Sequence, residues 1–180
     1  SGVGSFVLAD RPDAPAPPAN DRAGTSDTQL SVRFAETLPN DRGSAIFGVQ
    51  LAMDDGEGGP FLTVVGEDET VPTLQTTYVA VGARKGRAYR FRCRVRNSIG
   101  WSAWSSPDSL IVAAVSPGKP AAPRLGSASS STISLLLSVP EDSGGSPLLL
   151  FELFINNGDD GQEANTQVTT YTASSLQHSL

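Results

Sequence analysis

Apolar and polar side chains alternate along several short stretches of this chain. Apolar residues fill every second position of 30–34 and of 49–53. In 89–96, two aromatic residues, a cysteine and a valine alternate with four arginines. A strand with one face against a core shows this period of two, because successive side chains point to opposite faces of a sheet. Residues 110–115 are predicted to form a closing strand, and no stretch keeps a helical period.

Turn signals separate these stretches. The pairs Asp55-Gly56 and Asn157-Gly158 accept the positive φ angles of tight hairpin turns. The chain holds 18 glycines and 13 prolines, which favour turns over long helices. Many short strands joined by turns predict an all-β fold built as a β-sandwich.

The sequence also repeats itself, with an offset that falls from 108 residues (12 to 120) to 93 residues (76 to 169). Residues 12–15 recur as 120–123, 30–34 as 133–137, 40–44 as 142–146, 49–56 as 151–158, and 76–80 as 169–173. Proline-rich segments at 11–18 and 116–123 mark the boundaries of the repeat. Proline stiffens a chain and donates no hydrogen bond, so these segments are predicted to be short, semi-rigid linkers.

The residues of the first repeat resemble fibronectin type III modules. The resemblance is carried by Pro15, by residues 43–49, and by the series Gly86, Tyr89, Phe91, Cys93, Val95, Asn97 and Gly100. Two core positions depart from the family: its second-strand tryptophan is replaced by Phe34 and, in the next repeat, by Leu137, and its leucine six residues before the strand tyrosine is Ala83 in the first repeat, whereas Leu176 keeps it in the next. Each replacement keeps an apolar side chain at a core position. The turn at 53–59 is similar to turns of long repeat proteins from single-celled eukaryotes.

The resemblance implies tandem, seven-stranded, immunoglobulin-like β-sandwiches arranged end to end. A module of this type takes roughly 100 residues, so the 180 residues exceed one module and fall short of two. Residues 1–10 are expected to be the last strand of a preceding module, 11–115 a complete module, and 116–180 a second module truncated before its last two strands. Such a module leaves a sheet edge unpaired. We therefore expect the chain to continue in both directions; the alternative is that another chain donates the missing strands.

The segment Trp101-Ser102-Ala103-Trp104-Ser105 matches the WSxWS signature of class I cytokine receptors, which closes a type III module in that family. On a regular strand its two tryptophans would face opposite sides, whereas a polyproline II-like twist of three residues per turn places both on one side. The neighbouring strand presents four arginines on one face: Arg90, Arg92, Arg94 and Arg96. The prediction is an Arg/Trp ladder in which each cation–π contact contributes about 0.5–2 kcal/mol.

Two further uses of this segment stay open beside the structural one. The arginine face could bind an anionic polysaccharide or an acidic protein. Trp101 could carry a C-linked mannose, since the family's WxxW motif is a known acceptor. A receptor role would also call for the family's cysteine-bridged companion domain, and the sequence holds a single cysteine.

Composition narrows the chemistry. The net charge of −6 disfavours bulk nucleic-acid binding, which needs phosphate neutralisation by Lys and Arg. Cys93 is the only cysteine, and its register predicts a buried, unreactive side chain. His178 is the only histidine and does not support a zinc site. No catalytic residue, cofactor or metal is predicted, and the apolar stretches are too short to span a membrane.

Acidic clusters on two matching turns are the remaining metal candidates. They comprise Asp54, Asp55 and Glu57 on the first turn, and Asn157, Asp159, Asp160 and Glu163 on the second. Calcium prefers such oxygen ligands, but the spacing does not fit an EF-hand loop. Because tight turns themselves favour Asp, Asn and Gly, these residues are predicted to shape turns.

These observations predict a non-catalytic, structural or adhesive spacer array of a larger surface or filament-forming protein. Its partners are expected to be neighbouring modules of the same chain and another protein or a glycan, with no nucleic acid and no membrane insertion. Two alternatives stay open: a receptor ectodomain that binds a protein ligand, and accessory modules of a larger enzyme. The expected location is extracellular or at the cell surface, with a cytoskeletal or ciliary array as the alternative.

Overall fold

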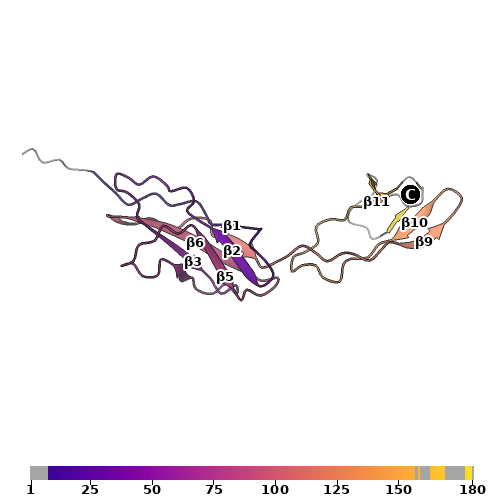
Figure 1. Cartoon of the computed structure of the whole chain (residues 1–180), viewed down its shortest axis with the longest axis horizontal. Helices are drawn as coiled ribbons and strands as arrows, with labels where there is room; N and C mark the ends of the chain where they lie inside the picture. The colour runs from indigo at the N-terminus through magenta and orange to yellow at the C-terminus, as the bar shows by residue number, and fades with distance from the viewer. Residues whose placement is uncertain (1–7, 157, 159–162, 169–176, 180) are drawn as a thin grey trace, which may run out of the picture. The chain divides into compact units, whose positions relative to one another are not determined.

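The computed structural model describes residues 8–156, 158, 163–168 and 177–179. These residues fall into two compact units, the first ending at Val115 and the second beginning at Ser116 (Figure 1). All regular secondary structure assigned within the described residues is β-strand. None of these residues forms a helix long and apolar enough to cross a membrane. The all-β class predicted from the alternating pattern is confirmed.

The first unit consists of two antiparallel sheets. Its strands are β1 (Ala19–Asn20), β2 (Gln29–Arg33), β3 (Gly48–Met53), β4 (Leu62–Val65), β5 (Thr77–Val81), β6 (Ala88–Asn97), β7 (Gly100–Trp101) and β8 (Ser109–Val112). One sheet has the order β1-β2-β5 and the other β4-β3-β6, with β7 and β8 both paired to β6. Because β3 occupies one edge of β6, β7 and β8 share the other edge. Two such sheets around one core make the predicted immunoglobulin-like β-sandwich.

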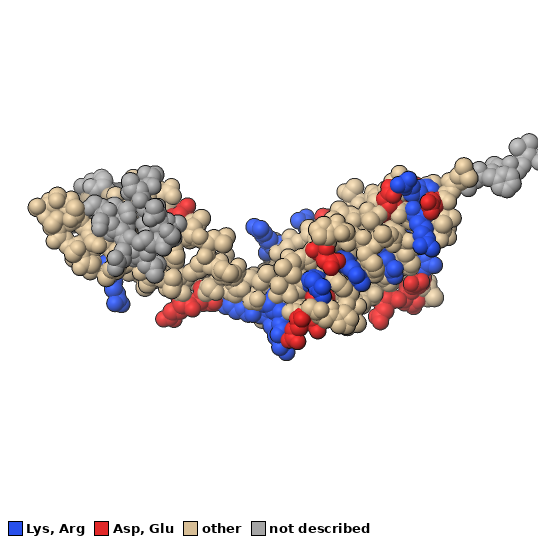
Figure 2. All heavy atoms as spheres, turned by 180° about the vertical axis from the view of Figure 1, so that it is seen from behind, with Lys and Arg blue, Asp and Glu red and all other residues tan. Residues whose placement is uncertain are grey.

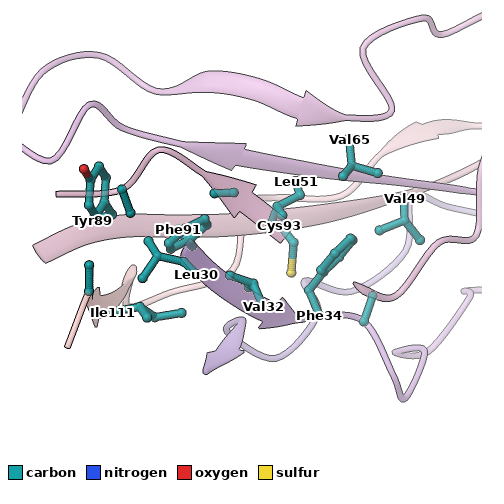
Figure 3. Packing of buried hydrophobic residues seen from close by; sticks show 14 of the residues in the cluster. Leu30, Val32, Phe34, Val49, Leu51, Val65, Tyr89, Phe91, Cys93 and Ile111 are labelled. Carbon is teal, nitrogen blue, oxygen red and sulfur yellow. The ribbon is translucent and has the colours of Figure 1, made fainter. Parts of the chain in front are cut away.

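The core lies between the two sheets. Side chains of β2 and β6 point toward one another there, with Phe91 and Cys93 of β6 near Leu30 and Val32 of β2 (Figure 3). Burial along β6 alternates strictly, so its apolar residues are inside and its arginines face outward. Cys93 is completely buried, as its register predicted, and desolvation raises the pKa of its thiol. Phe34, which stands at the family's tryptophan position, is 2% exposed.

Two polar side chains fasten the ends of β6. The hydroxyl of Tyr89 accepts a hydrogen bond from the backbone N–H of Arg84 at 3.1 Å, which ties the start of β6 to the chain before it. At the other end, the buried amide of Asn97 donates to the carbonyl groups of Asp10 and Asp41. The predicted strand at 1–10 lies mostly outside the described residues; its described end is bonded to the first unit through Asp10.

The strands of the second unit repeat the first part of the strand order seen in the first unit. Its strands are β9 (Arg124–Ala128), β10 (Ile133–Leu136), β11 (Phe154–Ile155), β12 (Thr166–Gln167) and β13 (Gln177–Ser179). The sheets in the described part of this unit are β13-β10-β9 and β11-β12. In chain order, β9, β10 and β13 match β1, β2 and β5, while β11 and β12 match β3 and β4. Strands that match β6 to β8 do not occur among the described residues of this unit.

Candidate functional site: the arginine–aromatic stack on β6

The outer face of β6 carries a continuous stack of guanidinium groups and aromatic rings. We call it the arginine–aromatic stack, and its members in spatial order are Phe47, Arg96, Trp101, Arg94, Trp104, Arg92, Phe61 and Arg90. The guanidinium carbon of Arg94 lies 4.7 Å from the ring centre of Trp101 and 4.5 Å from that of Trp104. The carbon of Arg92 lies 4.5 Å from Trp104 and 4.0 Å from Phe61. These distances fall within cation–π range.

The ends of the stack differ from its centre. The guanidinium carbon of Arg96 lies 5.5 Å from Trp101 and 6.0 Å from Phe47. Arg90 contacts Phe61, at 4.9 Å, rather than an indole ring. Sequence reasoning singled out the four arginines and two tryptophans and missed both phenylalanines. Phe47 precedes β3 and Phe61 precedes β4, so only the pairing of distant strands brings them to β6.

The two serines of the Trp-Ser-Ala-Trp-Ser segment explain how both tryptophans reach the same face. Ser102 donates its N–H to the carbonyl of Val95 at 2.8 Å, and its hydroxyl accepts from the Val95 N–H at 3.1 Å. Ser105 makes the same pair of bonds with Cys93, at 2.8 and 3.0 Å. Residues three apart in this segment thus bind residues two apart on β6. The one extra residue on this segment shifts the alternation of its side chains, as a β-bulge does, and Trp101 and Trp104 both lie against Arg94 on one side.

Acidic and amide groups hold the arginines in place from the side. Glu69 joins two members of the stack: one carboxylate oxygen accepts from Trp101 Nε1 at 3.1 Å and the other from Arg96 at 3.3 Å. Gln50 accepts from Arg94 Nε at 2.8 Å. Asp54, which is buried, accepts from Arg90 Nε at 2.7 Å and from the Arg90 backbone N–H. The hydrogen bond to Asp54 raises the pKa of Arg90.

The central arginines are held without ion pairs of this kind. Among the described residues, no ion pair involves Arg92 or Arg94. Desolvation lowers the pKa of Arg94, although an arginine remains charged in proteins. Arg92 Nε is buried and has no hydrogen-bond partner within the described part of the chain. Within the described residues, the Arg92 cation therefore packs between the ring faces of Trp104 and Phe61.

The acidic turn residues are engaged in turn and ion-pair contacts. Asp54 accepts from the Gly56 N–H as well as from Arg90. Asp55 accepts from the backbone N–H groups of Glu57 and Gly59, and these bonds lower its pKa. Glu57 pairs with Arg87 at 2.6 Å.

No group of three or more His, Cys, Asp or Glu residues suited to a metal ion occurs in the described ranges. Asn157, Asp159 and Asp160 lie outside the described residues, whereas Glu163 is described and exposed. The backbone of His178 pairs with Leu135 in the sheet of β10 and β13.

No protein-family model matches this chain. Solved structures that it resembles include the fourth fibronectin type III domain of a human protein, with 21% identity, a TM-score of 0.49, and coverage of 66% of this chain and 94% of that domain. Another is the sixth fibronectin type III domain of human fibronectin type III domain containing protein 3, with 19% identity, a TM-score of 0.47, and coverage of 68% and 98%.

A fragment of titin, domains A168–A170, is similar over 58% of this chain with 23% identity and a TM-score of 0.46. This chain spans 33% of the titin fragment's length. Structural neighbours of this chain are thus fibronectin type III domains. The fold assignment itself stands on the strand order and the core described above.

Proposed function

We propose that this chain is a stretch of tandem, non-catalytic fibronectin type III-like modules that set spacing and present binding surfaces in a larger protein. The observation that carries the proposal is the repeated strand order. Each unit starts with the same arrangement, three strands in one sheet and a hairpin of two in the other. Arrays of such repeats act as spacers because each module has its own core and linkers set the geometry between neighbours.

The arginine–aromatic stack supports a rigid module, as a spacer needs. Its members come from four separate stretches of the chain, the segments around Phe47 and Phe61, strand β6, and the segment at 101–104. Glu69 adds the loop after β4 to the same assembly. Because the contacts cross several strands, they resist sliding of β6 and of the edge strands beside it.

A distance measurement between spin labels tests the spacer role. We would place labels at Leu110→Cys in the first unit and Ser130→Cys in the second, both at exposed positions. The buried Cys93 should stay unlabelled. Stiffness of the proline-containing segment 116–123 predicts one narrow distance distribution, as narrow as that of a control pair within the first unit, Leu62→Cys with Leu110→Cys. A broad distribution from the native segment would argue against a stiff spacer.

A second candidate function is binding of an anionic glycan or an acidic protein ligand by the arginine face. Arg92 and Arg94 favour it because they have no described carboxylate partner. Figure 2 shows Lys and Arg groups in a row of separate patches across one face of the first unit, with uncharged atoms between them and acidic groups beside them. The wild-type chain should then be retained on heparin resin at low salt, Arg94→Gln should elute earlier, and Arg33→Gln on the other sheet should elute unchanged. Absence of retention would remove this candidate.

The location follows as a further part of the proposal. A C-linked mannose on Trp101 would fit an extracellular or surface array. The same fold would also serve a cytoskeletal or ciliary array, a receptor ectodomain or an accessory region of an enzyme. Intact-mass analysis of native material decides the modification. One added hexose that maps to Trp101 supports passage through the secretory pathway, and an unmodified Trp101 argues against it.

A further inference from the structure

Strand β5 has an open outer edge in the described part of the chain, since it ends the sheet β1-β2-β5. Phe34 donates its N–H to the Thr76 carbonyl at 2.9 Å, which fixes the alternation of hydrogen-bonded pairs between β2 and β5. Even-numbered residues of β5 bond to β2. The N–H and C=O groups of Thr77, Val79 and Val81 therefore point away from the sheet.

This edge lacks the usual protections against pairing. Natural edge strands are commonly blunted by lysine, proline or a bulge. The sequence of β5 is Thr-Tyr-Val-Ala-Val, and its register with β2 runs without interruption. Val79 is 48% exposed and Val81 is 80% exposed. The side chain of Gln75 donates to the Thr77 carbonyl, which leaves the outward groups of Val79 and Val81 as the pairing positions.

A groove of about 510 Å³ opens beside the start of this strand. It lies between the end of β4, the following loop and Tyr78 of β5. Its apolar lining includes Val64, Val65, Val71 and Tyr78, and its polar lining includes Glu67 and Asp68. An extended segment laid along β5 would therefore have a shallow, partly apolar surface for one of its side chains.

The charge at the groove selects the kind of segment. Glu67 and Asp68 are exposed, and neither forms an ion pair with a described residue. Hydrogen bonds from Thr70 lower the pKa of Asp68 and so favour its charged form. A segment with lysine or arginine complements these acids. A second copy of this chain fits less well, because both copies carry a net charge of −6.

We propose that the outer edge of β5 binds an extended, basic peptide segment by strand addition. The segment pairs its backbone with Val79 and Val81, places an apolar side chain in the groove at Tyr78, and brings a lysine or arginine to Glu67 and Asp68. The proposal rests on the proposed function, in which the modules present binding surfaces, and it names the class of partner for one such surface. It concerns a different face from the arginine–aromatic stack, and the spin-label distances do not depend on it.

Peptide titration of the isotope-labelled 180-residue chain tests the proposal by amide NMR. The probe is a blocked hexapeptide of alternating lysine and valine, and its matched control replaces each lysine by glutamate. We expect the basic peptide to shift and protect the amides of Val79 and Val81 and to shift those of Glu67 and Asp68. Equal binding of both peptides, or shifts confined to the arginine face, would overturn the proposal. A concentration-dependent dimer through β5 without peptide would overturn it in favour of a second copy.

Two changes separate strand addition from non-specific charge attraction. Val79→Pro removes an outward N–H that bonds nothing within its own sheet, whereas Val79→Thr keeps that N–H. The proline variant should bind the basic peptide about tenfold more weakly, as expected for one or two unmade hydrogen bonds. The threonine variant should bind as the native chain does.

N-methylation of alternate peptide residues gives the same test on the unchanged protein, which covers a proline variant that fails to fold. Methylation on the face that meets β5 should abolish binding. Undiminished binding of the methylated peptide contradicts backbone pairing.

Discussion

The two units start from corresponding strands, and among the described residues most of the buried apolar side chains belong to the first unit. Leu30 on β2 is 0% exposed, whereas Ile133, at the corresponding position on β10, is 47% exposed. Val49 is 1% exposed in the first unit, while Phe151, its counterpart, borders a cavity of about 220 Å³ together with Leu137 and Leu153. In the first unit, Phe91, Cys93 and Val95 of β6 are fully buried in the core.

The comparison shows which part of the module closes the core. The alternating pattern of the first strands is present in both units, so it does not by itself bury those strands. In the first unit, β6 supplies buried core residues, and it is fastened by Tyr89, Asn97, the serines of the Trp-Ser-Ala-Trp-Ser segment and the arginine–aromatic stack. Among the described residues of the second unit, no strand takes the place of β6.

The largest expected effect is a difference between matched core truncations. Leu30→Ala should destabilise the first unit by about 2–5 kcal/mol, because a fully buried leucine leaves a cavity. Ile133→Ala should change the stability of the second unit by less than about 1 kcal/mol, because the side chain is half exposed. Tryptophan fluorescence during denaturant unfolding reports the first unit, which holds both tryptophans, and amide exchange reports the second. Equal losses would contradict the comparison.

A smaller effect is expected from the serine that pairs with Cys93. Ser105→Ala leaves the buried N–H of Cys93 without its acceptor, at a cost of about 1–3 kcal/mol. The exposed neighbour provides the control, since Ser106→Ala should change stability by less than about 0.5 kcal/mol. Denaturant midpoints of both variants measure the difference. If Ser105→Ala behaved like the control, the serine would not be fastening this edge.

How far the sequence predicts these features depends on how local each one is. The strands around Leu30 and Phe91 were predictable because their alternation is contained in a few neighbouring residues. Phe61 and Glu69 were not, since each reaches β6 only after two or more strands pair. The open edge of β5 required knowledge of which residues pair with β2, because exposed valines in a sequence look the same as buried ones.

The smallest effect concerns Cys93 at alkaline pH. Burial raises the pKa of this thiol in the folded state above its unfolded value, which is about 8.5. The contribution of the protonated Cys93 thiol to the free energy of unfolding is therefore complete below about pH 8.5. It is lost as the pH rises through the folded pKa. Denaturant unfolding from pH 7 to 10 should show a decline that Cys93→Ala lacks. A native thiol that reacts rapidly with a disulfide reagent at pH 8 would contradict the burial.

Native-state amide hydrogen exchange of these 180 residues tests most directly the claim that β6 and its fastenings close the core of the first unit. We expect strong protection for the amides of β2, β3 and β6, and markedly weaker protection for those of β10 and β11. Equal protection in the two units would contradict it.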